Sequence, residues 1–329
     1  MINAPTPETL IQAAALLRAG GLVALPTETV YGLGADASNP AAAAKIFAAK
    51  GRPADHPLIV HLADAQALPG WAREIPDAAL ALARAFWPGP LTLILKKAAS
   101  VPNIVTGGQD TVGLRVPGHP VALALLRAFG GGIAAPSANR FGRISPTTAQ
   151  HVADELGNAV DMILDGGACA VGIESTILDL SRGAPVILRP GAIGADAIAA
   201  VIGRRPELPS TAQGTPAPRV SGSLSAHYAP RTPLRLVEAS ELEDRLRTAG
   251  AGTAVIARRP PVAIPHTVWI AAPKEADAYA HDLYANLRAL DASPAQLILV
   301  ETLPADAAWD AVRDRLGRAA AGSGEEEAT

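Results

Sequence analysis

Short apolar runs alternate with alanine-rich stretches over residues 1–203 of this 329-residue chain. The runs have the length of strands and the alanine-rich stretches have the length of helices, which is the pattern of an α/β domain. Some runs follow one another too closely for a crossover helix, so we expect a mixed sheet with antiparallel pairs. The runs comprise residues 22–25, 58–62, 91–95, 112–116, 133–135, 162–164, 175–180 and 186–188.

A change in composition divides the chain after residue 203. Residues 204–232 are rich in Pro, Ser, Gly and Thr and lack periodicity, which indicates a linker or an ordered lid. Residues 233–320 return to alternating strand-like and helix-like segments, which predicts a second, smaller α/β domain of Rossmann-like type. Residues 321–329 end in a run of glutamates and are predicted to form a disordered tail.

Composition limits where the chain works and what it binds. The single cysteine, Cys169, excludes an internal disulfide and a cysteine-rich zinc site. No basic N-terminal segment leads into an apolar one, and no run approaches about 18 apolar residues, so we expect a cytoplasmic protein without membrane insertion. The net charge of −3 argues against a broadly basic surface that coats nucleic acid, although a local basic cleft is compatible with it.

Two cations follow the first alanine-rich stretch. Lys50 and Arg52 supply a point charge and a planar fork, the two kinds of donor that grip phosphate oxygens. A solvated helix end, where cations interact favourably with the helix dipole, is the simpler interpretation. Pro53 and Pro57 hold the following residues in extended geometry and so fix the direction of Arg52, which favours an anion site.

Two strand-like runs end in proline followed by small hydroxyl side chains. The segments at these two strand ends are LPTET at residues 25–29 and APSAN at residues 135–139. An ordinary serine or asparagine turn would also explain the second segment. Because ligands of α/β sheets bind at strand ends, the two segments together indicate one polar crevice.

An arginine interrupts a third apolar run. Thr111, Gly113 and Arg115 alternate with apolar residues, so they share one face of the predicted strand. Two interpretations of Arg115 stay open, namely a structural ion pair with an Asp or Glu and a fork that binds a substrate carboxylate. His56 and His61 are not read as a zinc site, because no HExxH or carboxylate-spaced partner accompanies them.

The later runs contribute Ser175 and Arg189, within GIESTILDL and ILRPGAI. Neither GxxxxGK[ST] nor GxGxxG occurs in the sequence. A nucleotide would therefore bind without a Walker or Rossmann phosphate loop.

The motifs together resemble those of the YrdC-like domain in the threonylcarbamoyl-AMP synthase family. PTETVYGLG, KGRP, PLIVH, TVGLRVP, APSAN, ESTI and LRPGAI occur in its order and approximate spacing, and SLSAHYAPRTP is similar to the HYAP linker of the two-domain form. The resemblance implies a catalytic domain over residues 1–203, with a twisted mixed sheet flanked by helices. It further implies that residues 204–232 lie over the active site as a lid.

The resemblance implies a reaction of L-threonine, bicarbonate and ATP that gives L-threonylcarbamoyl-AMP and pyrophosphate, the first step of threonylcarbamoyladenosine modification of tRNA. Lys50 and Arg52 are the implied catalytic residues, and His56 departs from the family pattern, which more often has asparagine there. The implied threonine pocket is Thr29, His61, Arg115, Ala135 and Ser175. The implied ATP contacts are Lys50, Arg52, His56, Thr111, Ser137, Asn139, Ser145, Arg189 and Tyr228.

The resemblance also implies that Mg²⁺ arrives on ATP rather than on protein side chains, and that no organic cofactor is tightly bound. Downstream threonylcarbamoyl-transfer machinery acting on tRNA is the implied partner, and weak direct binding of tRNA is left open. Two alternatives are weighed: a non-catalytic module that binds double-stranded RNA or tRNA, and a carbamoyltransferase of the hydrogenase-maturation type. Few aromatic residues disfavour the first, and the absence of cysteine-rich zinc fingers disfavours the second.

Overall fold

The structure is a computed structural model that describes residues 2–208 and 217–324. The chain forms two compact units, one from Met1–Phe141 and Pro146–Ser223 and the other from Gly142–Ser145 and Leu224–Thr329. The segment predicted as a linker is therefore shared, since residues 217–223 belong to the first unit and residues 224–232 to the second. Residues 209–216 of that segment, and residues 325–329 of the predicted tail, lie outside the described residues.

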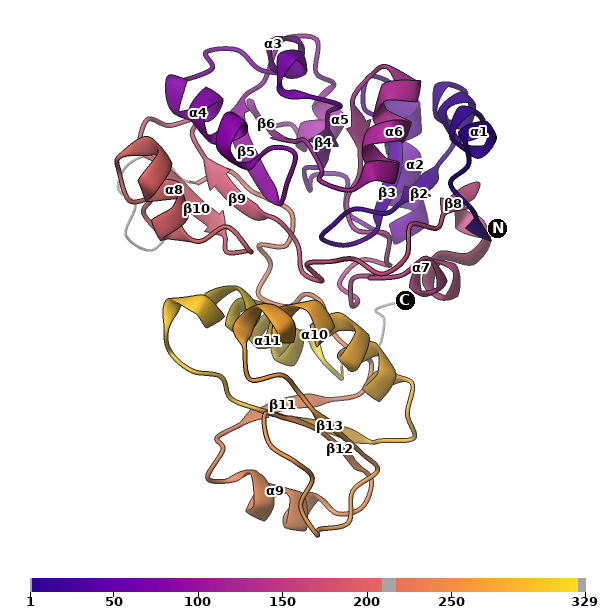
Figure 1. Ribbon diagram of the computed structural model, residues 1–329. Coiled ribbons are helices and arrows are strands. Elements are labelled where there is room, and N and C mark those ends of the chain that lie inside the picture. Colours follow the sequence, from indigo (N-terminus) through magenta and orange to yellow (C-terminus); the bar gives the residue numbers. More distant parts are fainter. Residues whose placement is uncertain (1, 209–216, 325–329) are drawn as a thin grey trace. The chain divides into compact units, whose positions relative to one another are not determined.

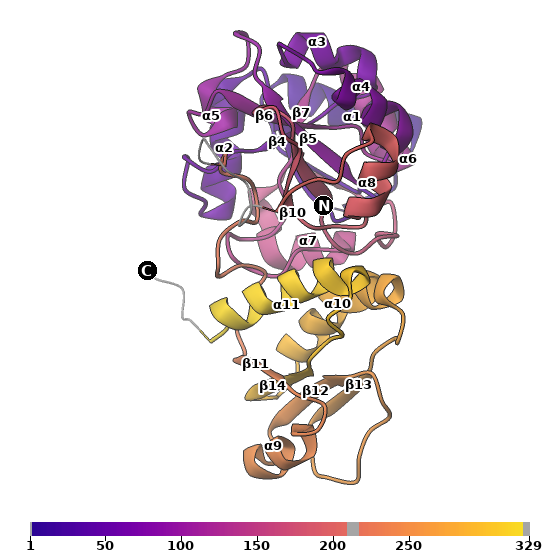
Figure 2. The same ribbon diagram turned by 90° about the vertical axis from the view of Figure 1, so that its left-hand side faces the viewer.

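The first unit, over its described residues, is built on a ten-stranded sheet with the order β1-β8-β2-β3-β7-β4-β6-β5-β9-β10 (Figures 1 and 2). Five neighbouring pairs are antiparallel and four are parallel, so the prediction of a mixed sheet is confirmed. The strands are β1 (Ile2–Asn3), β2 (Val23–Leu25), β3 (Gly32–Asp36), β4 (Ile59–His61), β5 (Leu91–Lys96), β6 (Thr111–Arg115), β7 (Ile133–Ala134), β8 (Met162–Leu164), β9 (Thr176–Asp179) and β10 (Val186–Arg189).

Helices bury both faces of this sheet. Apolar residues of α1 and α6 pack with β2, β7 and β8 in one cluster, and those of α2, α4, α5, α7 and α8 join a larger cluster that includes β3 to β6. The helices are α1 (Pro7–Arg18), α2 (Pro40–Lys50), α3 (Leu68–Trp71), α4 (Asp77–Phe86), α5 (Asn103–Thr106), α6 (Pro120–Phe129), α7 (Ala149–Leu156) and α8 (Ala195–Ile202), with short 3-10 turns at Ala65–Ala67 and Gly157–Ala159.

The ends of α2 determine where its cations are placed. The Asn39 side chain accepts hydrogen bonds from the first free backbone N–H groups of the helix, which caps it. Gly51 follows the helix with φ of 61°, a left-handed conformation that glycine adopts without strain. The chain therefore turns sharply between Lys50 and Arg52.

The sequence analysis did not predict strands β1, β3 and β13. β3 contains GLGAD, which has none of the β-branched or aromatic residues that mark strands. Its Gly34 lies so close to β2 that an added Cβ would come within 2.8 Å of the Leu25 side chain and 2.9 Å of the Val23 carbonyl oxygen. The close packing of β2 against β3 explains why position 34 is a glycine. Local β-propensity does not predict a strand at this position.

The second unit is a smaller α/β domain, as predicted, with a parallel sheet of order β11-β14-β12-β13 over its described residues. Figure 1 shows α10 and α11 on one face of this sheet and α9 on the other. The bounds are β11 (Leu234–Val237), α9 (Leu242–Ala249), β12 (Thr253–Ala257), β13 (Val268–Ala271), α10 (Ala276–Asp291), β14 (Leu297–Glu301), a 3-10 turn (Ala307–Trp309) and α11 (Asp310–Gly322). The last helix runs two residues into the predicted tail.

None of the helices within residues 2–208 and 217–324 is long and apolar enough to cross a membrane.

Candidate functional site

The end of β6 and the loop after β2 bring an arginine and a threonine together. Arg115 is the last residue of β6, and it pairs in register with His61, the last residue of the parallel strand β4. The Arg115 guanidinium donates from Nη1 to Thr29 Oγ1 over 3.0 Å and from Nε to the Gly89 carbonyl over 3.2 Å. Thr29 Oγ1 lies 2.8 Å from Thr27 Oγ1, so a buried chain of hydroxyl groups leads away from the arginine.

The remaining guanidinium nitrogen of Arg115, Nη2, forms a buried ion pair. Nη2 donates to Glu28 Oε1 over 2.6 Å, and the side chains of Arg115 and Glu28 are 4% and 13% exposed. The other carboxylate oxygen of Glu28 accepts a hydrogen bond from the Gly118 backbone N–H over 2.8 Å. Burial alone would raise the pKa of Glu28, but Arg115 and these hydrogen bonds outweigh it and hold the pKa below its usual value. The structural ion pair, one of the two interpretations of Arg115, is therefore present.

His61 is held in its neutral form. It is buried, and burial together with the nearby Arg115 charge lowers its pKa to about 3. Its Nδ1 has no hydrogen-bond partner among the described residues. A neutral imidazole with an unsatisfied ring nitrogen is suited to meeting a polar group of a ligand.

Ser175 joins the predicted threonine pocket to the predicted ATP contacts. Its Oγ lies 2.8 Å from Thr92 Oγ1 and accepts a hydrogen bond from Arg189 Nη2 over 3.1 Å. Arg189 Nε also donates to the Ser175 carbonyl over 3.1 Å. Ala135, the remaining member of the predicted threonine set, is buried directly after β7 and donates its N–H to the Ile59 carbonyl.

Lys50 is buried beneath the APSAN segment. Its Nζ donates to the Ser137 carbonyl over 2.6 Å and also to the Asn139 carbonyl. Burial, and secondarily the Arg52 charge, lower the pKa of Lys50 well below its usual value. Lys50, at the end of α2, is therefore hydrogen-bonded to the APSAN segment. The interpretation of Lys50 as a cation at a solvated helix end is wrong.

Arg52 and Arg189 converge on one residue of the predicted lid. Arg52 Nη2 donates to Ser221 Oγ over 3.3 Å, and Arg189 Nη1 donates to the Ser221 carbonyl over 2.9 Å. The neighbouring Val220 is buried among apolar residues of the sheet. The guanidinium groups of two arginines that lie 137 positions apart in the sequence thus contact the same residue.

The remaining predicted ATP contacts of the first unit, His56 and Thr111, lie near Arg52 and Ser221. The Phe141 ring lies 5.6 Å from the Arg52 guanidinium and 5.2 Å, edge-on, from the His56 ring. Burial and the Arg52 charge lower the pKa of His56. Thr111 begins β6 and lines a narrow hollow together with Ser221 and its neighbours.

Ser145 and Tyr228 belong to the second unit, unlike the other predicted site residues. The Ser145 carbonyl accepts a hydrogen bond from Arg288 Nε over 3.4 Å. Tyr228 has a left-handed φ of 61°, is 1% exposed, and lies under the guanidinium of Arg315 at 5.3 Å from its ring centroid. A non-glycine residue in this conformation needs surrounding packing to hold it.

The sequence analysis missed four residues that organise the site. Glu28 was visible in LPTET but was given no role, although a carboxylate between two threonines at a strand end was a usable signal. Thr92 and Phe141 carried no local signal, and Ser221 was predicted only as part of the lid segment, because the contacts of these residues are with partners far away in the sequence. Over the described residues, no group of three or more His, Cys, Asp or Glu side chains could hold a metal ion.

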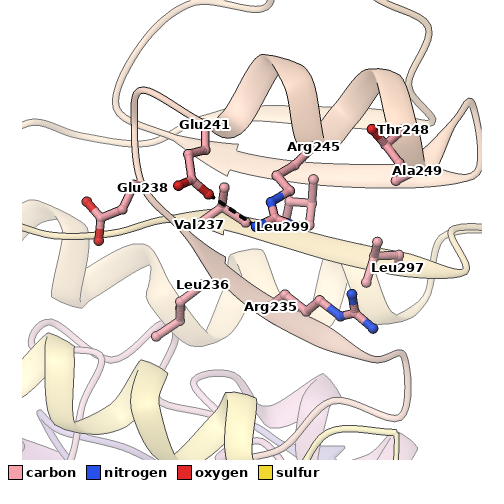
Figure 3. A pocket seen from close by; sticks show the side chains of 10 residues that line it. All are labelled: Arg235, Leu236, Val237, Glu238, Glu241, Arg245, Thr248, Ala249, Leu297 and Leu299. Atoms are coloured by element: carbon pink, nitrogen blue, oxygen red, sulfur yellow. Dashed lines mark hydrogen bonds and ion pairs between the residues drawn. The ribbon is translucent and has the colours of Figure 1, made fainter.

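A separate pocket of about 530 Å³ lies in the second unit between β11, β14 and α9 (Figure 3). Val237, Leu297 and Leu299 are among its apolar lining residues, and the Glu241–Arg245 ion pair of 3.3 Å lies at its side. None of the predicted site residues lines it.

Sequence profiles of two domain families cover most of the chain. The family described as "Telomere recombination" matches residues 15–191, and "Threonylcarbamoyl-AMP synthase, C-terminal domain" matches residues 193–321. A threonylcarbamoyl-AMP synthase of Bacillus subtilis is 41% identical over 322 residues, which are 95% of this chain and 93% of the relative. The chain belongs to the threonylcarbamoyl-AMP synthase family.

Two further comparisons concern Pyrococcus abyssi. Its threonylcarbamoyl-AMP synthase is 48% identical over 227 residues, which are 69% of this chain and 67% of the relative. A crystal structure of P. abyssi Sua5 complexed with L-threonine is similar with a TM-score of 0.89 and 38% identity, covering 98% of each chain. Membership of the threonylcarbamoyl-AMP synthase family thus extends over both domains.

Proposed function

We propose that this chain is an L-threonylcarbamoyl-AMP synthase, which forms L-threonylcarbamoyl-AMP and pyrophosphate from L-threonine, bicarbonate and ATP. The observation that carries the proposal is the hydrogen bond between Arg189 and Ser175. This bond supports the proposal because Arg189, a candidate phosphate-binding residue, contacts Ser175, a member of the candidate threonine pocket. An amino acid and a nucleotide bound by these residues would lie side by side. Family membership over nearly the full length supports the same activity.

The amino-acid pocket lies at the ends of β4 and β6. Arg115 forks onto the threonine carboxylate, and Thr29, His61 and Ser175 meet its hydroxyl and amino groups. Ala135 bounds the pocket from the end of β7. Because these side chains are buried, a substrate group that fails to pair with them leaves a costly unsatisfied polar atom.

The nucleotide is bound next to this pocket by the cations. Lys50, Arg52 and Arg189 neutralise the phosphates, and His56, Thr111, Ser137 and Asn139 supply further polar contacts. The family resemblance also implies Ser145 and Tyr228, which belong to the second unit, as ATP contacts. Mg²⁺ carried by ATP would add to the neutralisation of the phosphate charge.

The chemistry needs positioning more than covalent catalysis. The threonine ammonium group releases a proton to water, and the resulting neutral amine attacks the carbon of bicarbonate. Loss of water then gives a carbamate. A carbamate oxygen then attacks the α-phosphorus in line, and pyrophosphate leaves. Lys50 and Arg52 act as catalytic residues by stabilising the charge that develops on the phosphates.

Confinement protects the intermediates, because both a carbamate and a mixed anhydride decompose in water. Residues 1–203 form the catalytic domain in this proposal, and residues 204–232 form its lid. The product passes, in the cytoplasm, to threonylcarbamoyl-transfer machinery acting on tRNA, and weak direct binding of tRNA is compatible with this role.

Pyrophosphate release tests the proposal directly. We expect release only when L-threonine, bicarbonate and ATP are all present, with threonylcarbamoyl-AMP formed in equal amount. Release that needs no threonine would indicate another carbamoyl-adenylate chemistry. Failure to release pyrophosphate with all three substrates, combined with binding of tRNA, would favour the non-catalytic alternative.

A further inference from the structure

Glu28 is a partly accessible carboxylate inside the pocket assigned to the amino acid. Its side chain, 13% exposed, is fixed at both oxygens, by Arg115 Nη2 over 2.6 Å and by the Gly118 N–H over 2.8 Å. Its backbone carbonyl also accepts a hydrogen bond from the Val171 N–H over 2.7 Å. The carboxylate is therefore held at both oxygens, and the backbone of the same residue is held by a third hydrogen bond.

The fixed carboxylate still has capacity to bind a cation. A carboxylate offers about four acceptor positions, and the contacts with Arg115 and Gly118 use one on each oxygen. The titratable neighbours of Glu28 besides Arg115 are His61, His119 and the Cys169 thiol. Burial lowers the pKa of both histidines and raises that of the thiol, so Arg115 is the one charged group among these neighbours at neutral pH.

This pair of opposite charges matches the shape of an α-amino acid. Such a substrate carries a carboxylate and an ammonium group on the same carbon. When Arg115 binds the carboxylate, the ammonium group lies within a few ångströms of the guanidinium, which Glu28 Oε1 contacts over 2.6 Å. A pocket with only the arginine would bind a simple hydroxy acid equally well.

We propose that Glu28 recognises the α-ammonium group of the substrate and so makes the pocket selective for an amino acid. The inference rests on the proposed function, because it takes the Arg115 pocket as the threonine pocket. In the competing explanation Glu28 only orients Arg115. The two explanations differ in one respect, namely whether loss of the Glu28 charge affects ligands that have no amino group.

Isothermal titration calorimetry with two ligands separates these explanations. L-threonine and 3-hydroxybutanoate share the carboxylate and the hydroxyl group, and 3-hydroxybutanoate lacks the amine. In Glu28→Gln, which keeps the size of the side chain, we expect threonine affinity to fall about tenfold to a hundredfold, as for loss of a charge-assisted hydrogen bond. Affinity for 3-hydroxybutanoate should change less than about threefold, since glutamine still offers one oxygen to Arg115 and loses only the hydrogen bond from the Gly118 N–H.

Equal losses for both ligands would overturn the proposal and leave Glu28 as a positioning residue for Arg115, and unchanged threonine affinity would also overturn it. Glu74→Gln, at an exposed ion pair, is the matched control and should leave both affinities unchanged. If Glu28→Gln does not fold, Glu28→Asp moves the charge without removing it, and an unchanged ratio of the two affinities would then overturn the proposal. Absence of threonine binding to the unmodified protein would instead contradict the proposed function itself.

Discussion

Arg189 donates a hydrogen bond from Nη1 to the backbone carbonyl of Ser221 over 2.9 Å. Arg52, from a distant part of the sequence, donates a hydrogen bond to the hydroxyl group of the same residue over 3.3 Å. Both guanidinium groups are buried. The two arginines proposed to hold ATP phosphates are therefore already directed at one residue, Ser221, which belongs to the proposed lid.

The contact with Ser221 predicts that ligands tighten the lid. Phosphate oxygens can accept hydrogen bonds from both arginines and from the Ser221 hydroxyl, and hydrogen bonds between oppositely charged groups are stronger than the present ones, whose acceptors on Ser221 are neutral. We expect tryptic cleavage after Arg219 to slow several-fold when ATP and L-threonine are both present. Mass spectrometry identifies the cut, and the fragment should vanish in Arg219→Gln. Equal cleavage rates with and without both ligands would mean that this segment is a tether.

Nucleotide affinity should depend on Arg52. Replacement of Arg52 by alanine removes a charge-assisted contact worth roughly 1.5–3 kcal/mol, so ATP affinity should fall about tenfold to a hundredfold. Calorimetric titration with ATP measures the effect. Arg84→Ala, which removes an exposed arginine of α4, is the control and should bind ATP normally. An Arg52→Ala protein that binds ATP as tightly as the control would refute the phosphate assignment.

Amino-acid selectivity should follow the buried hydroxyl and imidazole groups. Valine has the shape of threonine but no hydroxyl, so it would leave Thr29, His61 or Ser175 with an unpaired polar atom. Serine keeps the hydroxyl and loses one methyl group, which costs less. At equal amino-acid concentrations, we expect the rate of pyrophosphate release to be moderately lower with serine than with threonine, and severely lower with valine. Comparable rates with valine and threonine would exclude this pocket.

His61 should make the fold sensitive to acid. Its pKa is about 3 in the folded chain against 6.5 as the ordinary value, so below pH 6.5 the unfolded chain takes up a proton that the folded chain does not. The free energy of unfolding should therefore fall with decreasing pH by up to about 1.4 kcal/mol per pH unit until the pH reaches the folded pKa.

Urea denaturation near neutral pH and at about pH 5 measures this loss, which for one such group amounts to roughly 2 kcal/mol at the lower pH. His61→Gln removes the group and should show a smaller decrease between the two pH values. His281→Gln, at an exposed histidine, should retain the decrease of the unmodified protein. If all three proteins lose the same stability, His61 is not held neutral by the fold.

The sequence by itself determined the α/β class, the division into a larger and a smaller domain, and most strands of the sheet. Strands such as β8, at residues 162–164, were predicted with the bounds that the structure shows, because their apolar character is local. The same local logic failed at β3, where Gly32 and Gly34 serve close packing between strands and carry no strand signal. The motifs also identified the polar residues at the strand ends.

Only the tertiary structure decided which of these residues meet. Arg115 was read equally well as a structural or a binding arginine, and its contact with Glu28 depends on β6 lying near the loop after β2. Ser221 was predicted only as part of the lid segment, and its contacts with Arg52 and Arg189, which join three distant parts of the chain, could not be read from the sequence. Sequence patterns report periodicity over a few residues, whereas ion pairs and hydrogen bonds between distant segments arise from the packing of the whole sheet.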